Sequence, residues 1–257
     1  MPTVSSIFSN SPINLGNDNF LHIIEIESIS PALGNLINDK IRLITEGNTS
    51  TDVAVVKKRL SDYLHKKKGT TIEMGAVAEF MIHLYLNHIG FKQEFLFYNL
   101  EERSIKKGFD GYYTINKEEW ILESKSGNSS VSGNTHPSKF SEAYADLETK
   151  VKDANGNNPW RNAYNHACHV DVQSPEDIRK NLKLLADDFD SNKYKEIENL
   201  NIIPASTLFL EGTWISANQS EIETQIRSLL TSKAYKRIHI LCINKKSIEL
   251  LSDFLNT

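Results

Sequence analysis

The stretch KKGFDGYYTINKEEWILESKSG, residues 106–127, predicts the element around which the rest of the fold is arranged. FDGYYTI (109–115) and WILESK (120–125) are rich in aromatic and apolar residues, as β-strands are, and the polar NKEE (116–119) between them predicts a turn. The sequence therefore predicts an antiparallel hairpin. Its charged residues need a separate explanation, because a hairpin that only has to pack would carry apolar side chains in their places.

Charged side chains gather at one end of this predicted hairpin. Successive side chains of a strand point to opposite faces, so Glu123 and Lys125 share one face. If the hairpin turns at residues 116–119, Asp110 lies level with them on the other strand. Two carboxylates in one small volume are unfavourable unless a cation lies between them.

This charge pattern suits in-line attack on a phosphodiester. Mg²⁺ binds carboxylate oxygens together with waters and substrate phosphates, and Asp110 and Glu123 would provide such oxygens. Lys125 would lie beside the metal, placed to orient or deprotonate a water or to stabilise developing negative charge. The alternative is a surface hairpin with a cross-strand salt bridge. A second acidic-x-Lys triplet, residues 148–150, falls in a predicted helix and shows what chance alone produces.

A helix upstream of the hairpin carries a further carboxylate. TIEMGAVAEFMIHLYLNHIGF (71–91) is apolar nearly all round, which predicts a buried helix. Glu79 stands in the middle of it. An ionised carboxylate is almost never fully buried unless it is paired or binds a metal. An ion pair with a lysine, or a helix edge that meets solvent, explains Glu79 equally well.

Strands and helices alternate along the rest of the chain, which predicts an α/β or mixed α+β fold with a central sheet flanked by helices. The stretch 126–137 between the hairpin and the next helix is polar and predicts a mobile loop. The other predicted strands are 20–29, 92–100, 206–214 and 237–244, and the other predicted helices are 30–44, 50–69, 138–153, 175–190, 219–233 and 246–255.

Composition places limits on the class of protein. The chain has 257 residues and a net charge of −4, which argues against coating nucleic acid by bulk charge, although a local basic groove remains compatible with it. No run of 18 apolar residues occurs, and the N-terminus lacks the pattern of a signal peptide, so we expect no membrane span. The two cysteines, Cys168 and Cys242, lie far apart, which suits a reducing cytoplasm.

The charged residues also carry a resemblance to a known family. Glu79, Asp110 and the triplet Glu123-Ser124-Lys125 resemble the active-site signature of the PD-(D/E)xK nuclease superfamily, with Phe109 where the signature usually has proline. The resemblance implies a restriction-endonuclease-like core and Mg²⁺-dependent cleavage of DNA, with Mn²⁺ as a possible substitute. It further implies that Asp110 and Glu123 are metal ligands, that Lys125 is the catalytic lysine, and that Glu79 is a further ligand, bound directly or through water.

A narrower resemblance is to the HamA family, the nuclease subunit of Hachiman-type bacterial anti-phage defence systems. The shared features are a G-x-x-x-E helix (75–79), a G-x-D-G strand (108–111), the ESK triplet, and the alanine-bearing helix FSEAYADLETKV (140–151). This resemblance implies a helicase partner encoded by a neighbouring gene and a location in the bacterial cytoplasm.

The chain is then expected to form a single nuclease domain over residues 1–257. The core motifs cover about 50–155, after an N-terminal extension (1–49) and before a C-terminal α/β part (156–257) where the resemblance is looser. Lys106, Lys107 and the predicted loop 126–137 are candidates for contact with a phosphate backbone, although plain solvated surface explains them equally well.

Other functions have weaker support. NHACHVD (165–171) gathers His166, Cys168, His169 and Asp171, but no second ligand pair follows at zinc-site spacing. The chain has no Gly-x-x-x-x-Gly-Lys-Ser/Thr loop, so any ATP-driven step would belong to a partner. A stand-alone restriction-type endonuclease and a catalytically silent, nuclease-fold binding subunit remain as alternatives.

Overall fold

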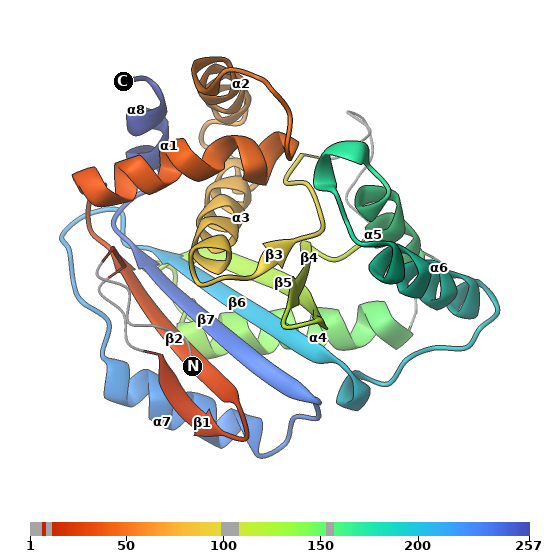
Figure 1. Cartoon of the computed structure of the whole chain (residues 1–257). Helices are drawn as coiled ribbons and strands as arrows, with labels where there is room; N and C mark the ends of the chain where they lie inside the picture. The colour runs from red at the N-terminus through yellow and green to blue at the C-terminus, as the bar shows by residue number, and fades with distance from the viewer. Residues whose placement is uncertain (1–6, 9–11, 99–107, 153–156) are drawn as a thin grey trace.

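The computed structural model describes residues 7–8, 12–98, 108–152 and 157–257, and its centre is one mixed β-sheet (Figure 1). The strand order is β1-β2-β7-β6-β5-β4-β3. The central strands β2, β7, β6 and β5 are parallel to one another, while β1, β4 and β3 pair antiparallel towards the two edges. The strands are β1 (Ile13–Gly16), β2 (Asn19–Ile26), β3 (Lys92–Gln93), β4 (Gly111–Ile115), β5 (Glu118–Asn128), β6 (Asn201–Phe209) and β7 (Arg237–Lys245).

Helices cover both faces of the sheet, which confirms the predicted fold class. One face, here called the α3 face, packs against α1 (Pro31–Glu46), α2 (Val53–Lys66), α3 (Thr71–His88) and α8 (Glu249–Leu255). The opposite face, the α4 face, packs against α4 (His136–Lys152), α5 (Pro159–Ala167), α6 (Glu176–Asp190) and α7 (Gln219–Leu230). Two short 3₁₀ helices, η1 (Val170–Val172) and η2 (Ile197–Asn199), lie in the connections. Among the described helices, none combines the length and apolar character that crossing a bilayer requires.

The C-terminal hundred residues supply the middle of the sheet. Strands β6 and β7 lie between β2 and β5, so they join the N-terminal strands to the hairpin (Figure 1). All nine residues of β6 are buried. Parallel strands that are covered on both faces read as continuous apolar runs, which explains the sequence NIIPASTLF. Strand β6, which follows about 80 residues later in the chain, therefore holds the hairpin in place by pairing along β5.

Local sequence signals set the helix boundaries. Pro31 begins α1, and the Ser30 side chain accepts a hydrogen bond from Leu33 N. Helix α2 begins after Asp52, whose carboxylate accepts from Ala54 N. Asp is among the residues preferred at this position, because its short side chain can reach the first turn. The α3 N-cap is Thr70.

Three predicted elements differ from the observed ones. The strand predicted over 92–100 pairs only at Lys92–Gln93, because Phe95 and Phe97 then turn into opposite core clusters; residues 99 and 100 lie outside the described part. The strand predicted over 206–214 runs instead from Asn201 to Phe209. The stretch predicted as a loop, 126–137, is divided among the end of β5, a short hydrogen-bonded turn and the start of α4.

Two leucines of α6 test how much the α4 face contributes to stability. Leu182 is fully buried there, whereas Leu184 on the same helix is 64% exposed. We expect Leu182→Ala to lower the free energy of unfolding by about 2–5 kcal/mol, through lost burial and the cavity left behind. Leu184→Ala should change it by no more than about 0.5 kcal/mol. Urea denaturation measures both, and equal effects would contradict the assigned faces.

Candidate active site

The register of the β4–β5 hairpin brings the predicted site residues together. Its turn consists of Asn116 and Lys117, both with positive φ (51° and 65°), which is the conformation of a two-residue hairpin turn that matches the sheet twist. Gly111 pairs with Leu122, and Asp110 N donates a hydrogen bond to Leu122 O at 3.0 Å. Asp110 is therefore level with Glu123. Strand pairing with β4 ends here, while β5 continues to Asn128.

Asp110 is held by the middle residue of the ESK triplet. Both the backbone N–H and the hydroxyl of Ser124 donate to Oδ2 of Asp110, each at 2.8 Å. Gly111 follows Asp110, and a Cβ on it would lie 2.8 Å from the Tyr113 ring, so the glycine allows this close approach. The carboxylate is thus fixed by main-chain and side-chain contacts at the start of β4. The sequence had given Ser124 no such role.

Glu123 is a buried carboxylate between two lysines. The residue is 2% exposed. Lys125 Nζ lies 3.2 Å from its Oε1, and Lys150 Nζ, from α4, donates to its Oε2. Burial, and next the charge of Asp110, raise the pKa of Glu123 to about 8, although the two lysines act in the opposite direction. An added positive charge near Glu123 would therefore strongly stabilise its ionised form.

Lys125 has a second carboxylate partner on α4. Its ammonium group donates to Asp146 Oδ2 as well as to Glu123. Burial alone would lower the pKa of Lys125, but the charges of Glu123 and Asp146 raise it above its usual value. The side chain is then an ammonium at neutral pH. In this state it can stabilise negative charge but cannot remove a proton from water.

Helix α4 thus completes a network of four charges that the sequence did not reveal. Asp146 and Lys150 are one helical turn apart and present opposite charges to the pair on β5. Lys150 belongs to the triplet 148–150 that had served as the example of a chance motif. The spacing of residues along α4 could have indicated this network. Ala143 and Leu147 mark the buried stripe of the helix, and Asp146 and Lys150 flank that stripe.

Glu79 lies on the α3 side of this site. It is partly exposed, which agrees with a helix edge that meets solvent and leaves the ion pair, the other explanation drawn from the sequence, as a prediction. Besides burial, the charges of Glu79 and Asp110 both raise the pKa of Tyr113. The Tyr113 hydroxyl also hydrogen-bonds to Nδ1 of His83. Glu79 on α3 and Asp110 just before β4 therefore both act electrostatically on the same buried tyrosine.

The donor set fits a divalent cation with two protein ligands. Mg²⁺ is usually bound by one or two carboxylates and completes its coordination with waters and substrate phosphates. Asp110 and Glu123 form such a pair, and Glu123 is destabilised as an anion by burial and by Asp110. Within the described residues, no three His, Cys, Asp or Glu side chains form a group that could hold a metal ion. Glu79 does not complete such a group as the side chains stand, and its role as a ligand remains a prediction.

The residues of NHACHVD have ordinary structural contacts. His166 stacks on Phe95, with 3.6 Å between ring centroids, and its Nδ1 accepts from Leu96 N. His169 accepts from Asp171 N at the start of η1. Lys106 and Lys107, the candidates for contact with a phosphate backbone, lie outside the described residues.

Comparison of the sequence with family models and curated proteins gives no relative. No family model matches the sequence, and no curated protein matches it. The chemistry of the site is therefore inferred from the contacts described above and from the resemblance of its motifs.

The raised pKa of Glu123 predicts how stability depends on pH. Between about pH 4.5 and 8 the folded protein retains a proton on Glu123 that the unfolded chain releases, so this residue's contribution to stability falls as the pH rises. The difference in unfolding free energy between wild type and Glu123→Gln should shrink by about 1 kcal/mol or more across this range. Urea denaturation at several pH values measures it, with the exposed Glu148→Gln as the control. A difference that grows with pH would mean that the lysines keep Glu123 ionised.

Lys150 and Lys152 provide a matched pair on α4. Lys150 reaches the buried Glu123, whereas Lys152 pairs with exposed Glu148 and Glu196. We expect Lys150→Met to destabilise the protein by about 1–3 kcal/mol at pH 8, because a buried carboxylate loses a cation. Lys152→Met should have little measurable effect. Equal results for the two variants would contradict the four-charge network.

Proposed function

We propose that this protein is a metal-dependent phosphodiesterase that cleaves DNA. The observation that carries the proposal is the hairpin register, which sets Asp110 beside Glu123 and Lys125 at the point where β5 extends beyond β4. Two carboxylates and a permanent ammonium in one half-buried volume match the needs of phosphodiester hydrolysis. The resemblance to the PD-(D/E)xK signature involves the same residues.

Each side chain has a distinct task in this proposal. Asp110 and Glu123 would hold Mg²⁺, which would supply charge stabilisation for the phosphate and activation of the attacking water. Lys125 donates to a non-bridging phosphate oxygen and stabilises the charge that develops there. Ser124 keeps Asp110 in place through its two hydrogen bonds. Lys150 holds one oxygen of Glu123 and so orients the carboxylate.

We further propose that the chain is the nuclease effector of an anti-phage defence complex, in the bacterial cytoplasm, with a helicase as partner. The motifs shared with the HamA family support this assignment. The net charge of −4 supports it too, since a partner that grips the DNA would supply the attraction that this chain lacks. A stand-alone restriction-type endonuclease is the alternative within the same chemistry.

One observation favours a second candidate, a nuclease-fold subunit that binds but does not cut. Both oxygens of Glu123 contact lysines, and Lys125 also contacts Asp146. A network that satisfies its own charges is stable without a metal. The two candidates make opposite predictions in a cleavage assay.

We expect Mg²⁺-dependent cleavage of plasmid or linear DNA by the purified protein, with or without the helicase encoded beside it. Glu123→Gln, Lys125→Met and Asp110→Asn should each reduce the rate at least about 100-fold, because two of them remove a proposed metal ligand and the third removes the ammonium group. Glu148→Gln, an exposed change in the second acidic-x-Lys triplet, is the matched control and should cut like wild type.

The outcomes separate the candidates. A requirement for the helicase favours the defence complex, and cutting alone at discrete sites favours a restriction-type enzyme. DNA binding without cleavage under any condition favours the silent subunit. Cleavage that survives all three substitutions would show that the nuclease active site lies elsewhere.

A further inference from the structure

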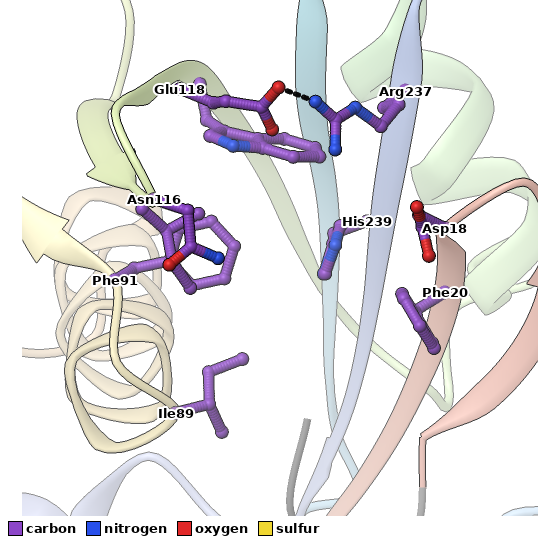
Figure 2. Close-up of a pocket in the computed structure, with 10 residues that line it drawn as sticks. Asp18, Phe20, Ile89, Phe91, Asn116, Glu118, Arg237 and His239 are labelled. Carbon is purple, nitrogen blue, oxygen red and sulfur yellow. Dashed lines mark ion pairs between the residues drawn. The ribbon is translucent and has the colours of Figure 1, made fainter. Parts of the chain in front are cut away.

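A cavity of about 330 Å³ lies on the α3 face of the sheet, away from the four-charge network. It is formed where the β1–β2 and β4–β5 hairpins turn, near the first residues of β5 and β7 and the end of α3 (Figure 2). Its lining is part aromatic and apolar, and part polar: Asp18, Phe20, Ile89, Phe91, Ile115, Asn116, Glu118, Trp120, Arg237 and His239. Glu123 and Lys125 face α4 instead, so the cavity is a separate candidate site.

Aromatic rings surround His239 in this cavity. The ring centroids of Trp120, Phe20 and Phe91 lie 4.8, 5.2 and 5.4 Å from that of His239. Trp120 and Phe91 meet His239 edge to face, at 82° and 80°. Such walls favour a flat, unsaturated occupant, since ring faces and edges attract one another when they stack or meet at right angles.

Two polar groups lie among these rings. Trp120 is 2% exposed, and its buried indole N–H makes no hydrogen bond within the described residues. His239 Nδ1 is bonded to His22 Nε2 at 3.0 Å, and His22 Nδ1 to the Tyr85 hydroxyl at 2.8 Å. Burial lowers the pKa of both histidines, that of His239 to about 4, so both rings are neutral at pH 7. The second nitrogen of His239 then donates or accepts one hydrogen bond.

The charged groups of the lining argue against an anion. Glu118 and Arg237 form an ion pair at one end of the cavity, with His239 below them and Asp18 to one side (Figure 2). Two carboxylates and one guanidinium leave the lining with one net negative charge. A phosphate would meet that charge while the guanidinium is already paired. The ring edge of a nucleobase, by contrast, carries both donors and acceptors and matches the mixture of Asn116, His239 and Trp120.

We infer that this cavity binds a nucleobase, held against its aromatic lining and hydrogen-bonded at its edge. The volume is at the lower end of ligand pockets, which suits one nucleoside and not a larger molecule. The base comes either from a free nucleoside or from a nucleotide turned out of a strand. This site does not depend on the nuclease activity proposed above, because none of the residues that line it belongs to the four-charge network.

Titration of the purified chain with adenosine, guanosine, cytidine, uridine and thymidine in EDTA tests this inference by calorimetry and saturation-transfer NMR. We expect at least one nucleoside to bind, and its monophosphate to bind more weakly. Ile115→Trp, which fills the cavity, should weaken binding at least tenfold. Trp120→Phe keeps an aromatic ring at this position but removes the indole N–H, and should weaken binding about threefold to tenfold.

Two control variants should bind like wild type. Ile215→Trp makes the same exchange at an exposed position that does not line the cavity, and Glu123→Gln disables the proposed nuclease site. A single-stranded oligonucleotide that binds more tightly than the nucleoside, with the same loss in Ile115→Trp, identifies a strand as the source. Tighter binding of the nucleoside identifies the free form.

Absence of binding by every nucleoside at 10 mM would overturn the inference. So would binding that both Ile115→Trp and Trp120→Phe leave unchanged, or capture of choline in place of any nucleoside, which would mark a cation site. Should Ile115→Trp fail to fold by its thermal melt, Trp120→Phe decides the matter alone. None of these results bears on cleavage at Glu123.

Discussion

Pairing between β4 and β5 is the constraint on which the candidate active site depends. A slip of one residue in a strand moves every side chain to the opposite face. Such a slip would turn Glu123 from α4 toward α3 and separate it from Asp110. The two-residue turn at Asn116 and Lys117 fixes the register, and pairing of β5 with β6 along its length keeps the strand in place. The chemistry of the site thus begins with backbone geometry.

Much of this arrangement was predictable because it is local in sequence. The hairpin, the nearness of Asp110 to Glu123 and the long apolar helix α3 all follow from residue patterns within one helix or across one tight turn. The start of β6 was missed because Pro204 is unusual in a central strand. Lys150 and Asp146 were missed because their partners lie more than 20 residues away, where periodicity carries no information. The cavity is lined by residues from four separate segments, so no single stretch of sequence predicts it.

Buried polar groups are stabilised in different ways on the two faces of the sheet. On the α4 face, the carboxylate of Glu123 is compensated by neighbouring charges. On the α3 face, Tyr85, His22 and His239 form a neutral chain of hydrogen bonds that ends among aromatic rings. Charge compensation suits a site that receives ions, while a neutral chain suits one that receives an uncharged ring. One sheet thereby supports two sites with opposite ligand preferences.

The central position of β6 and β7 has a consequence for how the chain is made. When a ribosome has produced the hairpin, the strand that will flank β5 is still about 70 residues from being synthesised. Until then, the inner edge of β5 is unpaired, and the partner face of α4 has only part of its sheet to pack on. The candidate site is therefore complete only after β6 has been synthesised. A shortened chain would carry every signature residue and still lack the sheet that aligns them.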